Sequence, residues 1–167
     1  MMPTMDIPHT GKVNAIADPG GAVLSPFQVA DPDRPSWGHK GASGNFCWVE
    51  LLTQDASVAK EFYSKVVGWE PMEMEMDGTQ YCMLMPPGAT PDQAQGGIMK
   101  MDNPEVPDNW LPYISVTDVE ATAAQAVELG GTICVPPATL GTHGKIAVLI
   151  DTQNAVFGIY QSLGGDC

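Results

Sequence analysis

Two segments far apart in this chain carry nearly the same sequence, and this internal repeat constrains the fold more than any other feature. Residues 11–28 and 144–161 align without a gap. Both read as two apolar runs around a polar turn, which predicts a β-hairpin. The identical pairs are Gly11 and Gly144, Lys12 and Lys145, Asp18 and Asp151, Ala22 and Ala155, Val23 and Val156, and Gln28 and Gln161. Because a repeated segment marks a repeated structural unit, the chain looks like the end of one repeat followed by a complete second repeat.

The composition excludes several classes of function. The formal net charge is −13, with 7 Lys and Arg residues against 20 Asp and Glu residues, which argues against nucleic acid and anionic membrane surfaces as partners. No apolar run approaches the ~18 residues of a membrane helix, and the N-terminus lacks a signal-peptide pattern. We therefore expect a cytoplasmic protein whose cysteines are reduced, because they lack CxxC spacing. The cysteines are Cys47, Cys82, Cys134 and Cys167.

The chain divides into three parts. Residues 1–28 contain the first hairpin. Residues 29–44 are rich in Pro, Gly and Asp, which break regular structure, so they predict a linker. Residues 45–163 have the length and apolar content of one module with its own core.

Within this module the predicted elements follow the order βαβββ twice, so that one helix covers one face of each four-stranded sheet. Strands are predicted at residues 45–52, 69–76, 79–85, 96–101, 110–116, 132–135, 145–150 and 155–161. Thr53 or Asp55 caps the first helix and Gly68 ends it; Asp118 caps the second, before Gly130. The helix residues expected to face the core are Val58, Phe62 and Val66, and then Val119, Ala123, Ala126 and Val127.

This order of elements comes with stretches that resemble the vicinal oxygen chelate superfamily, the group of glyoxalases, bleomycin-resistance proteins and extradiol dioxygenases. The matching stretches lie at residues 46–51, 55–69, 118–131 and 144–151, within a resemblance that covers residues 45–161. The resemblance implies an α+β fold in which paired βαβββ units form a curved mixed sheet, shaped as a cup, here with an extra N-terminal β-hairpin. That hairpin resembles the end of a preceding module, as in tandem-module members of the family.

In family enzymes the cup holds a divalent metal on inward-facing His, Gln or Glu side chains. The resemblance places three of those positions at Trp48, Leu111 and Gly158, none of which binds such a cation. Glu50 shares the inward face of its strand with Trp48, but one carboxylate does not make a metal site. His9, His39 and His143 lie in loops, where solvated histidines are more common than ligands. We therefore predict no metal site and no cofactor.

The residues expected to line the cup are largely aromatic and thioether side chains, which suit the binding of a small molecule. They are Trp48, Glu50, Tyr81, Met83, Met85, Leu111, Tyr113, Gly158 and Tyr160, with Trp110 near the rim. Which face of their strand Tyr81, Met83 and Met85 share is left open, and all these side chains could instead fill a core. A buried Glu50 is costly without a partner, so it is a candidate general base, or a residue simply hydrogen-bonded within the sheet.

We expect a protein that binds a small apolar or aromatic molecule without a metal. The alternatives are a divalent-metal lyase of the glyoxalase I type or a dioxygenase, and a structural module that pairs with another module. The N-terminal hairpin has open strand edges, which favour pairing. It could fold onto its own chain or cross to a second one, and we expect a homodimer. Pro26 is expected to weaken strand pairing on one side.

Overall fold

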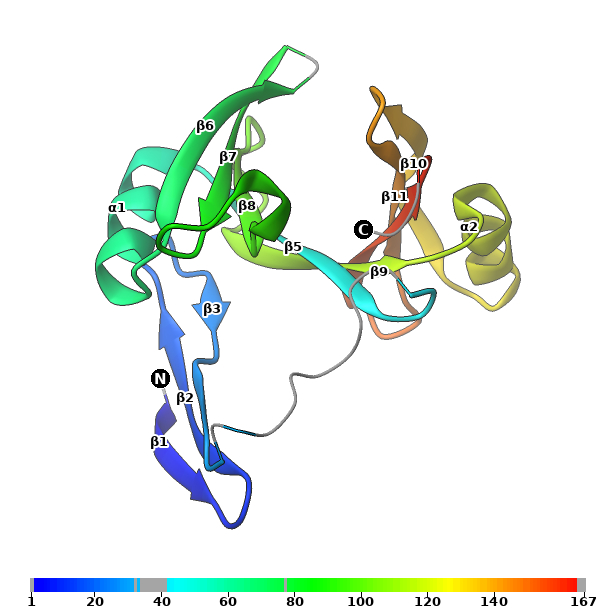
Figure 1. Cartoon of the computed structure of the whole chain (residues 1–167). Coiled ribbons are helices and arrows are strands. Elements are labelled where there is room, and N and C mark those ends of the chain that lie inside the picture. Colours follow the sequence, from blue (N-terminus) through cyan, green and yellow to red (C-terminus); the bar gives the residue numbers. More distant parts are fainter. Residues whose placement is uncertain (1, 32, 34–41, 77, 165–167) are drawn as a thin grey trace.

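The computed structural model describes residues 2–31, 33, 42–76 and 78–164, and Figure 1 shows a small N-terminal sheet beside a larger curved sheet with two helices. The elements are β1 (Met2–Ile7), β2 (Gly11–Ala17), β3 (Val23–Leu24), β4 (Phe27–Val29), β5 (Phe46–Thr53), α1 (Ala56–Val66), β6 (Glu70–Met76), β7 (Thr79–Met85), a short 3-10 helix (Pro91–Gln93), β8 (Gly96–Lys100), β9 (Asn109–Ser115), α2 (Val119–Glu128), β10 (Thr132–Leu140), β11 (Gly144–Ile150) and β12 (Val156–Ser162).

The larger sheet confirms the predicted α+β fold with two βαβββ units. Its eight strands lie in the order β10-β11-β12-β9-β5-β8-β7-β6, so each unit forms one half of the sheet. The two halves meet where β5 and β9 pair antiparallel. Figure 1 shows the halves curving toward each other, with α1 and α2 on the outer sides and an open concave face between them. This concave face is the cup.

Helix α1 begins and ends as predicted but buries a different face. Asp55 accepts hydrogen bonds from the backbone N–H groups of Ser57 and Val58, both at 3.1 Å. The buried residues are Ala59 and Tyr63, whereas Val58 is 42% exposed. Of the predicted stripe, Phe62 packs against the core, whereas Val58 and Val66 were predicted wrongly because Tyr63 takes the buried position, with partners for its hydroxyl group.

Helix α2 follows the prediction except at its end. Asp118 caps its first turn by accepting a hydrogen bond from Ala121 N at 2.8 Å. Val119 and Ala123 are buried against the outer face of the sheet, but Val127 is 48% exposed. The sheet residues that they contact are Ala147, Leu149 and Ile159. No helix among the described residues is both long and apolar enough to span a bilayer.

The N-terminal sheet is a structural copy of the last three strands. It contains one strand that was not predicted, β1, which pairs with β2 as β10 pairs with β11. In the two turns Ala22 N donates to Asp18 Oδ1 at 2.9 Å, and Ala155 N donates to Asp151 Oδ1 at 2.8 Å. The backbone N–H groups of both aspartates bond the carbonyls of the same alanines. The repeat in the sequence therefore encodes one turn geometry twice.

The turn of the N-terminal sheet packs against α1 of the same chain. Ala22 is 1% exposed and belongs to a core cluster with Ala59 and Tyr63 of α1 and with Leu51 of β5. The hydroxyl group of Tyr63 donates to Asp18 Oδ2 at 3.1 Å. Away from this turn, residues 3–7 of β1 and all of β4 are exposed. Within the described residues, the sheet is thus attached to the module through the turn end.

Candidate functional site

The concave face of the larger sheet brings most of the predicted site residues together. Trp48 of β5 lies opposite Tyr113 of β9, which in turn lies opposite Gly158 of β12. Directly paired residues share one face of a sheet, so these three residues form a row across the junction of the two halves. Leu111 and Tyr160 belong to the same face, in a cluster with Tyr113.

Glu50 lies at the centre of this face and is 7% exposed. The hydroxyl group of Tyr113 donates to Glu50 Oε2 at 3.2 Å, and Tyr81 makes a second side-chain hydrogen bond with Glu50. Trp48 Nε1 donates to the hydroxyl oxygen of Tyr81 at 2.9 Å. Tyr81 therefore faces the cup, which answers the question that the sequence left open.

Burial governs the protonation of this group. Loss of water raises the pKa of Glu50 above its ordinary value of 4.5, and the hydrogen bonds from Tyr81 and Tyr113 lower it by less. Burial and the nearby Glu50 charge also raise the pKa of Tyr81 and of Tyr113, so both phenols remain donors. The cup floor therefore carries one carboxyl group that takes up a proton more readily than an exposed glutamate.

One wall of the cup is built from methionines. In β6 Met and Glu alternate, so the methionines face the cup and Glu73 faces α1, where it pairs with Lys60. The strand register places Met72 opposite Met83, and Met74 opposite Tyr81. We call this surface the methionine wall: Met72, Met74, Met76, Met83, Met85 and Met99. Sequence reasoning named only two of the six, although the Met–Glu alternation was the signal for three more.

Two glycines let the tyrosine rings lie close to the sheet. A Cβ atom on Gly97 would lie 1.9 Å from the hydroxyl oxygen of Tyr81, and one on Gly158 would lie 2.2 Å from Cδ1 of Tyr113. Any side chain at either position would therefore push a ring away from the floor. The two glycines set how deep the floor of the cup lies.

Trp110 does not belong to this site. Its Nε1 donates to the hydroxyl oxygen of Tyr63 at 2.9 Å, and the two rings are 5.2 Å apart between centroids. Strand alternation explains the difference, because Leu111 faces the cup and its neighbour must face α1. The expected position of Trp110 near the rim is corrected accordingly.

The donor set of the cup does not fit a divalent metal. Trp48, Leu111 and Gly158 offer no imidazole or carboxylate, and the oxygens of Glu50 already accept hydrogen bonds from tyrosines. Among the described residues no three His, Cys, Asp or Glu side chains are grouped as metal ligands would be. His39 lies outside the described residues.

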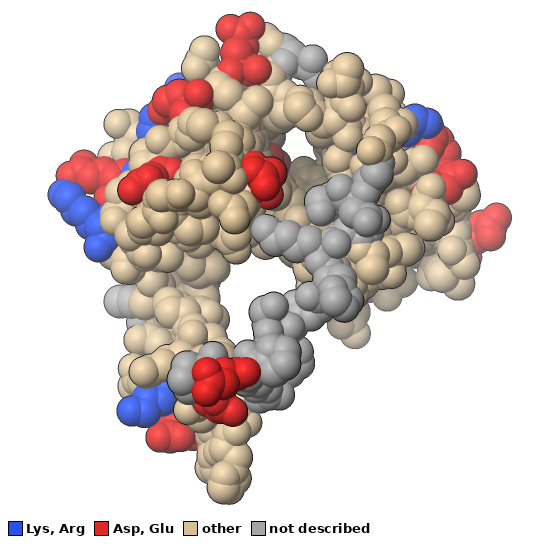
Figure 2. All heavy atoms as spheres, in the orientation of Figure 1, with Lys and Arg blue, Asp and Glu red and all other residues tan. Residues whose placement is uncertain are grey.

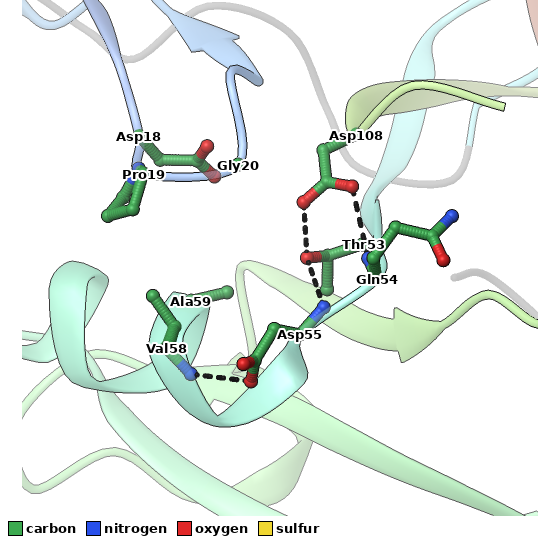
Figure 3. Close-up of a pocket in the computed structure, with 9 residues that line it drawn as sticks. All are labelled: Asp18, Pro19, Gly20, Thr53, Gln54, Asp55, Val58, Ala59 and Asp108. Atoms are coloured by element: carbon green, nitrogen blue, oxygen red, sulfur yellow. Dashed lines mark hydrogen bonds between the residues drawn. The ribbon is translucent and has the colours of Figure 1, made fainter. Parts of the chain in front are cut away.

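A cavity of about 350 Å³ lies where the N-terminal turn meets the module. Figure 3 shows Asp18 on one side of it and Asp55 and Asp108 on the other. Each carboxylate already has a structural role: Asp18 and Asp55 cap backbone N–H groups, and Asp108 accepts from Thr53 Oγ1 at 2.5 Å. These groups hold the loops together, so the cavity is a weaker candidate than the cup.

A second cavity, of about 300 Å³, lies between α1 and β6–β8. The Lys60–Glu73 ion pair occupies its lining. Burial raises the pKa of the Cys82 thiol there to about 11, so it stays protonated at neutral pH. Cys47 and Cys82 are free and buried, as expected, whereas Cys134 is exposed. Lys100 is the remaining charged residue of the described lining, and it lies on the exposed end of β8.

Comparison with known families agrees with this fold. Residues 45–157 match the model of the Glyoxalase/Bleomycin resistance protein/Dioxygenase superfamily, and the chain belongs to that superfamily. The resemblance inferred from the sequence is thereby confirmed.

Two relatives extend over nearly the whole chain. A protein of Mycobacterium tuberculosis named "Putative glyoxylase CFP32" is 36% identical over 164 residues, which is 95% of this chain and 59% of that protein. The anthracycline biosynthesis protein DnrV of Streptomyces peucetius is 28% identical over 162 residues, 96% of this chain and 56% of that protein. The chain thus spans less than two thirds of the length of either relative.

Solved structures of low sequence identity share the fold. A methylmalonyl-CoA epimerase of Streptomyces coelicolor, in complex with 2-nitronate-propionyl-CoA, matches with a TM-score of 0.56 and 15% identity, over 75% of this chain and 99% of that chain. The hypothetical protein BH1468 of Bacillus halodurans matches with a TM-score of 0.56 and 10% identity, over the same shares of the two chains. These likenesses support the fold alone.

Proposed function

We propose that the cup binds a small, largely apolar aromatic molecule and does so without a resident metal. The observation that carries this proposal is the methionine wall, which faces a second wall of aliphatic and tyrosine side chains across the buried Glu50. The second wall consists of Ile146, Val148, Tyr160 and Tyr113. Figure 2 shows that the molecule is hollowed between the two halves of the larger sheet.

The chemistry of the methionine wall suits an aromatic ligand. Thioether side chains are unbranched and polarisable, so they adapt to irregular shapes and make favourable contacts with aromatic rings. All its members except Met85, which is 4% exposed, remain partly accessible. A ligand would bury this apolar surface at about 25 cal/mol per Å².

Glu50 supplies a single polar contact at the floor. Its two oxygens offer about four acceptor positions, of which tyrosine hydroxyls use two. A ligand hydroxyl or amine could take a remaining position. Such a contact would fix the orientation of a ligand that is otherwise held by apolar surface.

A relative supports the aromatic class of ligand. DnrV is named for anthracycline biosynthesis, and anthracyclines are polycyclic aromatic compounds. The acidic chain, with a net charge of −13, favours neutral or cationic compounds over polyanions such as CoA esters.

Fluorescence titration tests the proposal. An anthracycline is titrated into the protein, with propionyl-CoA as the anionic comparison, and we expect saturable binding of the first. Met74→Gln should weaken binding about fivefold, or about 1 kcal/mol, because an apolar contact becomes polar. Met5→Gln, on the N-terminal sheet, is the matched control. Equal affinities for all three proteins, or no saturable binding of any aromatic probe, would contradict the proposal.

A second candidate function is proton transfer by Glu50, which its raised pKa and central position favour. Glu50→Gln separates the two functions. In a pure binding protein neither the natural chain nor the variant incorporates solvent deuterium into the bound compound, whereas a catalyst incorporates it and loses this exchange in the variant.

The same variant reports the protonation state of the folded protein. Because the pKa of Glu50 is raised above 4.5, the folded state binds more protons than the unfolded state between pH 4.5 and the raised pKa. The unfolding free energy of the natural chain should therefore fall as the pH rises from 4.5 to the raised pKa. Urea denaturation across this pH range should show that fall, and Glu50→Gln should lessen it. If the unfolding free energies of the two proteins depend on pH in the same way, the pKa of Glu50 is not raised in the folded state.

A further inference from the structure

The two copies of the hairpin differ in what their identical residues contact. In the C-terminal copy Lys145 and Gln161 are paired in the strand register and both hold α2. Lys145 Nζ lies 2.6 Å from Glu120 Oε1 in the first turn of α2. Gln161 Oε1 accepts a hydrogen bond from Val119 N at 3.0 Å, at the start of the same helix. These two side chains fix where α2 begins on the sheet.

The N-terminal copy keeps the same pair without a helix. Lys12 and Gln28 are paired in register, as Lys145 and Gln161 are. Within the described part of the chain, neither side chain takes part in a hydrogen bond or an ion pair. A pair that holds a helix in one copy is thus present but unused in the other.

The strand edge beside this pair is also open. Asn14 N donates to Pro26 O and Ala30 N donates to Thr10 O, so by antiparallel alternation the N–H and C=O groups of Phe27 point away from β2. No described strand pairs with that edge. Pro26 turns toward β2, and its missing N–H does not block the outer edge.

The equivalent edge in the C-terminal copy is occupied. There β12 pairs in parallel with β9, with Gly158 opposite Tyr113 and Tyr160 opposite Ser115. Val116 N donates to Tyr160 O at 2.8 Å, and Tyr160 is the repeat equivalent of Phe27. The occupant of the edge and the helix held by Lys145 and Gln161 are consecutive in the chain.

We propose that the N-terminal sheet binds a strand–helix unit of the β9–α2 kind, supplied by another module of the same superfamily. The strand runs parallel to β4 and bonds the backbone of Ser25 and Phe27. The helix follows it, with a carboxylate in its first turn on Lys12 and a first-turn N–H on Gln28. This inference is independent of what the cup binds.

Two features set the strength of this docking. In the C-terminal copy Ala147 and Ile159 contact α2, and their equivalents in the N-terminal sheet are Asn14 and Pro26. The docked helix therefore gains less apolar contact than α2 does. The strand edge and the Lys12–Gln28 pair must therefore carry more of the binding. CFP32 and DnrV both extend beyond the part that matches this chain, which leaves room for such a unit in the relatives.

Hydrogen exchange on an extended chain tests the proposal. The extended chain carries a second copy of residues 109–134 directly ahead of Met2. Met2 is the repeat equivalent of Val135, the residue that follows this segment in the C-terminal copy. We expect the amides of Ser25 and Phe27 to exchange at least tenfold more slowly than in the natural chain. The amide of Gln28, which points toward β2, is the internal control. Lys12→Glu should reduce the protection, and a Lys in place of the Glu in the added helix should restore it.

Two results would overturn the proposal. One is unchanged exchange at Ser25 and Phe27 in the extended chain, confirmed with residues 109–131 added in excess as a separate peptide. The other is protection of these amides in the natural chain that rises with protein concentration and is insensitive to Lys12→Glu. The latter would show that a second copy of this chain covers the edge instead.

Discussion

The N-terminal sheet and the β10–β12 sheet are one sequence placed in two surroundings. Both make the same aspartate turn, with nearly the same hydrogen-bond lengths. In the N-terminal copy Asp18 and Ala22 of the turn are buried and β2 is mostly half-buried, whereas in the C-terminal copy β11 and β12 carry the buried residues and the whole turn, residues 151–155, is exposed. The turn is therefore specified locally by Asp, Ala and a residue of positive φ, Gly21 or Asn154. Burial is decided by the neighbouring elements.

The exposed face of the N-terminal sheet follows from this difference. Its exposed apolar residues share one face, because each is paired in register with one of the alternate residues of β2 that lie on that face. They are Met5, Ile7, Val23, Phe27 and Val29, each between 38% and 60% exposed. Their counterparts in the C-terminal copy face the cup. A sequence that forms a cup wall in one place is thus left without an opposite wall in the other.

The largest expected difference between the copies is at the alanine of the turn. Ala22→Asp places a charge inside the α1 cluster and should destabilise the docked N-terminal sheet by about 3–5 kcal/mol. Ala155→Asp, at an exposed position, should change stability by less than about 0.5 kcal/mol. Urea denaturation together with limited proteolysis of residues 2–31 measures both effects. Similar losses in the two variants would show that the turns are equivalent in solution.

Substitutions of the two turn aspartates should differ less in their effect on stability. Asp18→Ala removes both the turn bond and the acceptor of the buried Tyr63 hydroxyl, and should cost about 2–3 kcal/mol. Asp151→Ala removes the turn bond only, at an exposed position, and should cost about 1 kcal/mol. A double variant with Tyr63→Phe should recover part of the Asp18→Ala loss in the same denaturation assay. Absence of that coupling would contradict the contact between the turn and α1.

The smallest difference in stability is expected between substitutions of the equivalent glutamines, Gln28 and Gln161. Gln161→Ala removes the side chain that caps α2 and should cost about 1 kcal/mol. Gln28→Ala removes a side chain without a described partner, so the natural chain should lose less than about 0.5 kcal/mol. Thermal unfolding followed by circular dichroism compares the two. A larger loss for Gln28→Ala would mean that its surroundings are already occupied.

The sequence predicted the fold well because the fold rests on local signals. The Asp55 and Asp118 caps, the glycines that end the helices and the repeated turn are each short-range features. The face of α1 was predicted correctly at Phe62 but wrongly at Val58, which apolar spacing favoured. Burial of Tyr63 depends on Asp18 and Trp110, which are distant in the chain.

The composition of the cup was only partly predictable. Alternation along β5 correctly placed Trp48 and Glu50 on one face, whereas the face of β7 could be assigned only from the contact of Tyr81 with Trp48. The remaining methionines of β6 could have been found by the same alternation. The position of Trp110 could also have been found, because it lies next to Leu111 on the strand.

The glycine floor gives the cup a means of changing selectivity indirectly. Gly97 and Gly158 lie beneath the rings of Tyr81 and Tyr113, so a substitution at either position would move a ring into the space above it. Such a change would make the cup shallower while the tyrosines, the methionines and Glu50 stay the same. Over evolutionary time, members of this lineage could therefore acquire new ligands through substitutions beneath the tyrosine rings, at positions that a comparison of the larger lining side chains alone would overlook.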